Sequence, residues 1–450
     1  MLGANRPVAW SGLALGLGIL LIGWALTAGR TAGGAPLPFR SLAPAAIPFF
    51  LAIAWALAQA LPYVPPQLHD SAWAEAGAAL GMALPGRISL APEEAGTGIM
   101  RLLSYGAVLL LAAQLGHSAR RAHAILWGVA LAGGAYALYG LLVWADGNRL
   151  ILWMAKWAYP DSLTSSFVSR NHYATYAGLG LCASLGLLAH ALARQPRAGA
   201  HTGAALIPLA LMIAAALLLT RSRGGIASAT LAVLVMTVLF AFGTEGRRTR
   251  MAFAAAALGL LAAGAGVLGG GVIARMAPEE VEDWGGRSDI WARAAAAALD
   301  RPLGGGLGAF ADFFPAYRDL ALGLQFGSLD KAHNLYLEMA AELGPTVAAA
   351  LVLGLGWLVL RVIRGSLAAN PGPALAAAGA SVLVAVHSLA DFSLQIPAVT
   401  ATWLLLLGAA LGQAQRAASL RATGRSRESA HKAPGDLPES PPRFASATDR

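Results

Sequence analysis

The feature that most constrains this 450-residue chain is a series of about eleven apolar segments, each long enough to cross a bilayer. A helix needs about 20 apolar residues for this, because its backbone amides find no water in the hydrocarbon core. Only 12% of the residues are charged, against about 25% in soluble domains. That charge is too sparse to cover a water-soluble body of this size. The chain is therefore predicted to be an all-α polytopic membrane protein.

The apolar segments lie near residues 8–28, 43–62, 99–116, 124–145, 172–193, 203–220, 224–243, 251–273, 344–361, 373–390 and 396–413. This spacing predicts membrane helices over 1–273, a large loop with short helices over 274–333, and further membrane helices over 334–413. The tail over 414–450 is rich in Arg, Ser and Pro and has no apolar periodicity. We expect it to be disordered and cytoplasmic.

The distribution of basic residues predicts which loops face the cytoplasm, since short loops rich in Lys and Arg stay inside. With alternating spans, one side receives the loops with Arg120, Arg121, Arg194, Arg197, Arg247, Arg248, Arg250, Arg361 and Arg364. The other side receives the acidic loop at 63–98, the 146–171 and 274–333 loops, and the turn at Asp391. That side is predicted to be periplasmic or extracellular. The basic inner loops also account for the net charge of +9, so no nucleic-acid partner is expected.

Four arginines are unexpected on the outer side, next to the ends of apolar segments: Arg170, Arg221, Arg223 and Arg287. An arginine near hydrocarbon costs a few kcal/mol and usually pairs with another group or lines a wet cavity. For any one of them, contact with lipid headgroups explains the position equally well, but it explains the whole set less well. The guanidinium fork matches phosphate oxygens. The set therefore predicts a site for a lipid diphosphate, such as a polyprenyl diphosphate.

His333 stands where the large outer loop re-enters the membrane, in the segment DKAHNLYLEMAAELGP. A neutral imidazole accepts a proton from a hydroxyl group near pH 7, as transfer to a sugar requires. A lone histidine is more often a satisfied core residue, but its place after the one long loop favours the catalytic interpretation. A metal site built from His172, His333, His387 and Asp391 is a weaker alternative, because their spacing matches no metal motif.

The motifs between about 165 and 350 resemble those of the O-antigen ligase and polymerase superfamily, a group of bacterial envelope glycosyltransferases. They are FVSRNHYATY, TRSRGG at the start of a span, GRSDIWARA followed by PLGGGLGAF in the long loop, and HNLYLEMAAELGP before the next span. The glycine-rich PLGGGLGAF is not followed by Gly-Lys-Ser/Thr, so it is interpreted as a tight turn and not as a phosphate-binding loop.

The resemblance implies a C-type glycosyltransferase architecture of about 11–12 membrane helices with a periplasmic loop, in the bacterial inner membrane. The donor it implies is an undecaprenyl-diphosphate-linked glycan, the acceptor is a lipid or glycan, and no cofactor or metal is expected. Matching the motifs, His333, Arg223 and Arg287 resemble the catalytic residues. The same segments supply candidates for substrate binding: Arg221, Arg170, Asn171, His172 and Asn334.

Several functions remain open at this point. The acceptor is the lipid A core or a growing surface polysaccharide, and a glycan polymerase or a protein O-oligosaccharyltransferase would use the same residues. An anion or lipid transporter is the alternative from another class. Transporters tend to contain inverted repeats with charges near the middle of the membrane. Here the charges gather at one face under a long loop, which favours glycosyl transfer.

Overall fold

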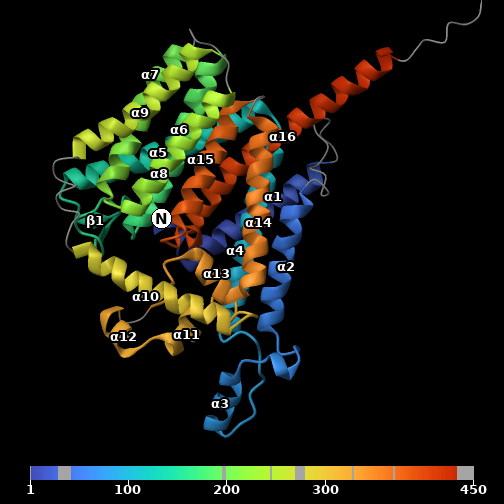
Figure 1. Cartoon of the computed structure of the whole chain (residues 1–450), viewed down its shortest axis with the longest axis vertical. Helices are drawn as coiled ribbons and strands as arrows, with labels where there is room; N and C mark the ends of the chain where they lie inside the picture. Colours follow the sequence, from blue (N-terminus) through green and yellow to red (C-terminus); the bar gives the residue numbers. More distant parts are fainter. Residues whose placement is uncertain are drawn as a thin grey trace, which may run out of the picture.

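The computed structural model describes residues 2–28, 42–194, 199–243, 246–268, 279–326, 329–367 and 370–432. Helices make up most of this part of the chain (Figure 1). The long helices of the bundle are α1 (Pro7–Ala28), α2 (Ala43–Ala60), α4 (Pro92–Gly116), α5 (Ala119–Ala145), α6 (Arg170–Arg194), α7 (Gly199–Leu219), α8 (Arg223–Gly243), α9 (Arg247–Leu268), α14 (Pro345–Ser366), α15 (Pro371–His387) and α16 (Pro397–Lys432).

Shorter elements join these helices. They are η1 (Leu2–Ala4), η3 (Pro66–Leu68), α3 (Ser71–Leu80), the hairpin of β1 (Leu150–Ile151) and β2 (Met154–Ala155), α11 (Phe310–Phe313), η4 (Phe314–Tyr317), α12 (Leu320–Phe326), α13 (Leu335–Leu343) and η5 (Ser393–Gln395). The remaining helix, α10 (Glu279–Asp300), lies in the large loop. The two strands pair antiparallel, with Leu150 opposite Ala155.

Each predicted apolar segment coincides with one long helix of the structure. Among the described residues, eight of these helices are long and apolar enough to cross a membrane. Two further apolar helices, 205–219 within α7 and α15, are shorter. The prediction of an all-α polytopic membrane protein is therefore confirmed.

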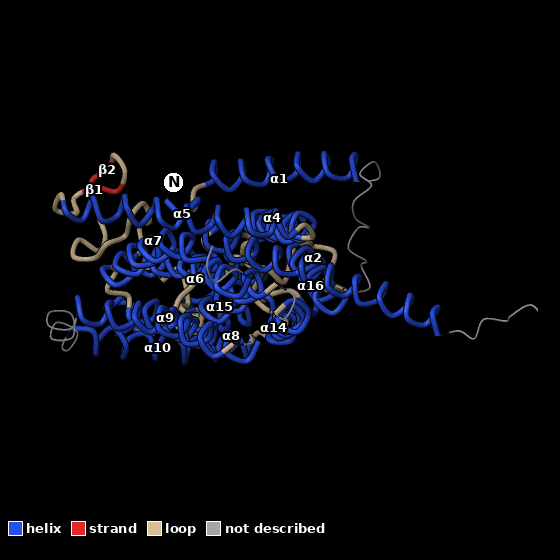
Figure 2. Tube along the Cα trace, turned by 90° about the horizontal axis from the view of Figure 1, so that it is seen from above, coloured by secondary structure: helices blue, strands red, loops and turns tan. Residues whose placement is uncertain are grey.

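The centre of the bundle is formed by α6, α15 and α16, whose side chains are mostly buried. Small residues allow close packing there. A Cβ atom on Gly133 of α5 would lie 2.9 Å from the Cα of Gly180 in α6, so a larger residue would push these helices apart. By contrast, α1 runs along the rim of the bundle (Figure 2) and exposes large apolar side chains such as Val8 and Ile19. Lipid would cover this face of α1 in a membrane.

The large loop folds into a cap at one end of the bundle (Figure 1). In this cap α10, α11, η4, α12 and α13 share a second apolar core, in which Phe310 stacks on Phe314 with ring centroids 4.6 Å apart. Ion pairs reinforce it. Arg301 at the end of α10 pairs with Asp70 before α3, and Arg293 pairs with Asp319 before α12. The cap is therefore a packed unit that is joined to the segment before α3.

Two elements are longer than the sequence predicted. The large loop was expected to hold short helices, but α10 runs over 22 residues from Glu279 to Asp300. The tail expected to be disordered from 414 is helical as far as Lys432. This part is rich in Ala and Arg, which favour helix, and its first proline is Pro434. Residues 433–450 lie outside the described residues.

The helix ends below the cap belong to distant parts of the sequence. Leu163, between α5 and α6, donates a backbone hydrogen bond to Leu219 at the end of α7. Leu335 at the start of α13 donates to Ser388 after α15. At the opposite end, Gln413 of α16 donates to the carbonyl of Gly116, next to the basic turn between α4 and α5. The fold thus brings the ends of α6, α8, α13 and α15 together under the cap.

Candidate active site

His333 has an unusual backbone conformation. It lies between α12 and α13 with a φ of 50°, in the left-handed region that costs a residue with a side chain on the order of 1 kcal/mol. The next residue, Asn334, caps α13 by accepting hydrogen bonds from two backbone N–H groups, both at 3.1 Å. The backbone N–H of Leu335 donates a hydrogen bond to the carbonyl of Ser388 at 3.0 Å. The contacts that follow His333 therefore fix its position at the end of α15.

One aromatic ring contacts both predicted site histidines. Phe392 lies in the loop between α15 and α16, and its ring meets His172 edge to face with centroids 4.8 Å apart. The centroid of His333 is 5.2 Å from the same ring, also edge to face. Edge-to-face contacts of this length are favourable for aromatic pairs. The structure thus brings His172, from the first turn of α6, close to His333.

The carboxylate of Asp391 is buried beside Phe392 and links three helices. Its Oδ1 accepts a hydrogen bond from the amide of Asn171 at 3.3 Å. Its Oδ2 accepts one from the hydroxyl of Ser393 and lies 3.8 Å from Nε2 of His172. Asn171 in turn accepts a hydrogen bond from the hydroxyl of Ser222 at 2.8 Å. The network therefore reaches from the loop after α15, through α6, to the start of α8.

A second branch of this network passes through Thr175. Its hydroxyl donates to Ser393 at 3.0 Å and lies 2.6 Å from Nδ1 of His387. Since Ser393 donates to Asp391, the hydrogen bonds run in one direction when His387 carries its proton on Nδ1. Gly224 leaves room for this ring, because a Cβ atom there would lie 3.1 Å from it. A buried chain of four polar groups thus ends at the Asp391 carboxylate.

The three residues predicted to be catalytic lie around this loop. Arg287 of α10 approaches it directly, with Nη1 3.5 Å from the carbonyl of Ala390. Arg223 begins α8 immediately after Ser222, and its Nη2 atom is buried. His333 approaches from the cap. The structure therefore brings Arg287 and His333 to the loop that holds Asp391, and it places the backbone of Arg223 one residue from the network.

The other two arginines contact aromatic side chains at the same end of the bundle. The guanidinium carbon of Arg170 is 5.4 Å from the ring centre of Tyr159, and that of Arg221 is 5.8 Å from Trp144. Both distances suit a cation–π interaction. Arg221 also has a left-handed backbone, with a φ of 54° in the short turn between α7 and α8. These arginines point toward the aromatic residues between the end of α5 and the start of α6.

His333 and Asp391 are titratable groups of the site that lie outside the membrane helices, and their surroundings favour different charge states. Burial and the positive charge of Arg287 lower the pKa of His333, and the nearby carboxylates offset this only in part. Burial opposes the charge on Asp391, but His172, His387 and the hydrogen bond from Ser393 hold its pKa below the ordinary value. At neutral pH the site therefore holds a neutral His333 imidazole and an ionised Asp391.

The glycine-rich segment predicted as a tight turn packs against the end of α13. Gly305 and Gly306 donate backbone hydrogen bonds to the carbonyls of Ala341 and Glu342, at 2.9 and 3.0 Å. Gly304 has a φ of 79°, and a Cβ atom there would collide with the carbonyl of Glu342. The absence of a side chain thus allows this close approach. The segment supports the helix that follows His333.

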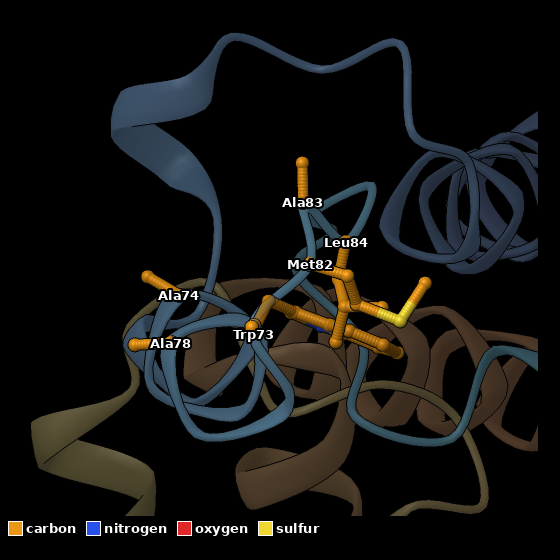
Figure 3. Close-up of a pocket in the computed structure, with 8 residues that line it drawn as sticks. Trp73, Ala74, Ala78, Met82, Ala83 and Leu84 are labelled. Atoms are coloured by element: carbon orange, nitrogen blue, oxygen red, sulfur yellow. The ribbon is translucent and has the colours of Figure 1, made fainter.

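The structure also has a hollow that carries no predicted site residue. This hollow of about 410 Å³ lies beside α3 and is lined by Trp73, Met82 and Leu84, among others (Figure 3). It contains no residue of the Asp391 network. Across the described residues, no three His, Cys, Asp or Glu side chains are grouped so as to hold a metal ion. The alternative metal site with His387 and Asp391 is therefore not formed there.

The Asp391 network was not predicted from the sequence. The sequence indicates His387 and Asp391 as a candidate metal-ligand pair, and it gives no reason to single out Ser222, Thr175 or Ser393. The one usable signal was the segment HSLADFS, in which a histidine and an aspartate sit four residues apart at the outer end of an apolar segment. A Ser or Thr in a membrane helix cannot be identified as a site residue from the sequence unless its neighbours in space are known.

The comparisons with known proteins bear on the same part of the chain. The family model described as O-antigen ligase matches residues 207–352. The match includes Arg223, Arg287 and His333, and it ends before Asp391. None of the curated proteins compared with the chain matches it. The matched region therefore holds the three predicted catalytic residues, whereas the Asp391 network is completed by helices on both sides of it.

Proposed function

By its match over residues 207–352, the chain belongs to the O-antigen ligase and polymerase superfamily of glycosyltransferases, and from this premise we propose its reaction. The protein transfers a glycan from an undecaprenyl-diphosphate donor to a hydroxyl acceptor. The acceptor is the lipid A core or a growing surface polysaccharide. The reaction takes place at the periplasmic face of the bacterial inner membrane.

In this reaction the acceptor oxygen attacks the anomeric carbon, and the bond from that carbon to the diphosphate breaks. The bonding electrons leave on the diphosphate, and the acceptor loses a proton. His333 takes this proton, because its lowered pKa keeps the imidazole neutral at neutral pH. A single displacement of this kind inverts the anomeric centre.

The leaving diphosphate gains negative charge as the bond breaks. Arg223 and Arg287 stabilise that charge, since guanidinium groups bind phosphate oxygens at any working pH. Arg170 and Arg221 lie at the same end and bind the remainder of the headgroup in this proposal. His172 borders the acceptor side through its contact with Phe392. Asn171 positions Asp391, because its amide donates a hydrogen bond to that carboxylate. Asn334 positions the start of α13, because its amide oxygen caps that helix.

One observation carries the proposal: the half-buried imidazole of His333, the guanidinium of Arg287 and the buried carboxylate of Asp391 lie around one short loop under the cap. His333 contacts Phe392, and Arg287 approaches Ala390, so both flank Asp391 in one short loop. Arg287 and His333 are 46 positions apart in the sequence, and the packing of α10 against α13 brings them together. Such a combination of a base with fixed positive charge suits the departure of a phosphate leaving group.

The test uses purified protein in nanodiscs with a synthetic polyprenyl-diphosphate oligosaccharide and a rough lipid A core acceptor. Release of the polyprenyl diphosphate and glycosylation of the acceptor are both measured. His333→Ala is expected to lower transfer by at least about 100-fold, as loss of a general base does. His117→Ala removes an imidazole at the opposite end of the bundle and should leave transfer unchanged. Equal transfer by His333→Ala and wild type would refute the role of His333.

Further arms of the same assay separate the alternatives. With donor as the only acceptor, longer lipid-linked chains would indicate a polymerase. With an acceptor protein, a serine-linked glycan would indicate an O-oligosaccharyltransferase. A transporter would move the intact donor across a liposome without releasing diphosphate. Transfer that survives a chelator is expected, because the proposed chemistry uses only protein groups.

A further inference from the structure

Glu338 is buried in α13, one turn after His333, and the proposed transfer reaction does not use it. A carboxylate is rarely buried completely, because the loss of its hydration must be offset by partners. Glu338 has three. Its Oε1 accepts hydrogen bonds from the ammonium of Lys331 at 3.2 Å and from the amide of Gln395 at 2.6 Å. Its Oε2 accepts one from the backbone N–H of Ala332 at 2.9 Å.

The partners of Glu338 come from the two loops that form the active site. Ala332 and Lys331 immediately precede His333. Gln395 ends the loop that carries Asp391 and Phe392. The Glu338 carboxylate therefore forms hydrogen bonds with the segment that precedes His333 and with the loop that carries Asp391. Hydrogen bonds to a charged acceptor are about twice as strong as neutral ones, so this link is firm.

The bond to Ala332 also bears on the strain at His333. The left-handed φ of His333 is disfavoured and persists only if the residues on both sides are held. On the following side, Asn334 caps α13 and Leu335 bonds Ser388. On the preceding side, the backbone N–H of Ala332 bonds Glu338. Without Glu338 one of the two anchors is lost, and His333 is free to relax to an ordinary conformation.

We propose that Glu338 is a positioning residue, which holds His333 in its left-handed conformation and fixes it relative to the Asp391 loop. Glu338 does not touch substrate in this proposal. The inference rests on the proposed transfer reaction, because it concerns the geometry of that reaction's base.

The experiment compares Glu338→Ala, Glu338→Gln and Lys331→Met with wild type and His333→Ala in the nanodisc assay. Glu338→Ala removes all three bonds and should lower kcat by about 10-fold to 100-fold with KM changed less than about threefold. Glu338→Gln keeps an acceptor for Ala332 and should restore kcat to within about fivefold of wild type. Lys331→Met removes only the ion pair and keeps the bond to Ala332, so it should lower kcat less than Glu338→Ala does. Thermal unfolding of each variant is measured alongside.

The outcomes separate this inference from the proposed function. If Glu338→Ala keeps full kcat while His333→Ala is inactive, the reaction stands and the positioning role is refuted. A purely structural role is indicated if Glu338→Ala lowers the unfolding temperature but the folded fraction turns over normally, and this too overturns the inference. If Lys331→Met loses as much kcat as Glu338→Ala, charge pairing is responsible and the backbone anchor is not. If wild type itself shows no transfer, the proposed function fails first.

Discussion

His333 acts as a base in this account because of its surroundings. Burial and Arg287 disfavour the imidazolium form, so the neutral ring persists below the ordinary pKa of about 6.5. Asp391 acts in the opposite sense, because its negative charge favours imidazolium. The sequence indicated His333 and Arg287 by their motifs. It did not indicate the conformation of His333 or the network around Asp391, which depend on contacts between segments far apart in the chain.

The pH dependence of transfer follows from this balance. The neutral imidazole is the active form, so kcat/KM should rise with pH, and the midpoint of this rise should lie below the ordinary pKa of about 6.5. Arg287→Gln removes a positive charge and raises the pKa of His333, so the acid limb of the residual activity moves to higher pH. The measurement is a pH profile of kcat/KM between about pH 4.5 and 8, a range in which the protein is expected to stay folded. A limb that stays in place would show that Arg287 does not act on His333.

Asp391 offers the opposite test. Asp391→Asn keeps an acceptor for the Ser393 hydroxyl but removes the negative charge, so the pKa of His333 falls further. The acid limb should then move to lower pH, while kcat falls because the network around His172 is disturbed. Ser393→Ala is the matched variant, since it removes the hydroxyl that bonds Thr175 and Asp391 but leaves the negative charge in place. An acid limb that moves to higher pH in Asp391→Asn would contradict this electrostatic account.

At the scale of elements, helix positions were predictable and loop structure was not. Apolar segments of membrane length predict helices, because backbone N–H and C=O groups without hydrogen-bond partners are too costly in the bilayer. The helical continuation of α16 to Lys432 was missed, because polar composition was interpreted as disorder although the residues favour helix. The motif PLGGGLGAF was correctly interpreted as a turn. Its packing against α13 required knowledge of Gly304 and its neighbour Glu342 in space.

Gly304→Ala tests the structural role of this turn. A side chain at Gly304 would need a left-handed backbone and would meet the carbonyl of Glu342. The variant is expected to lose about 1–3 kcal/mol of unfolding free energy, measured by chemical denaturation in detergent. Gly323→Ala in α12 is the control, because a Cβ atom there has open space around it and alanine favours helix. Equal stability of Gly304→Ala and wild type would show that the turn is adaptable.

At the scale of the whole molecule, the cap and the basic turns lie at opposite ends of the bundle. The sequence predicted this separation from the positions of arginines along alternating spans. The prediction that the cap faces the periplasm can be tested with membrane-impermeant maleimide. The only native cysteine, Cys182, is buried in the bundle. It should therefore contribute little background.

Two exposed positions serve as reporters of sidedness. Asp312→Cys lies in the cap and should be labelled in intact cells. Arg120→Cys lies in the basic turn between α4 and α5, and it should react only after the membrane is opened. The reverse pattern would place the candidate active site in the cytoplasm. In that case a periplasmic transfer reaction would be excluded.

The most direct test of the central claim is a cryo-EM structure of the protein with bound polyprenyl diphosphate, the product of the proposed reaction. The account predicts that the diphosphate lies under the cap, within about 3 Å of the guanidinium groups of both Arg223 and Arg287, with His333 facing the end from which the glycan departs. A diphosphate bound at the opposite end of the bundle, or at Arg170 and Arg221 with His333 out of reach, would contradict the account.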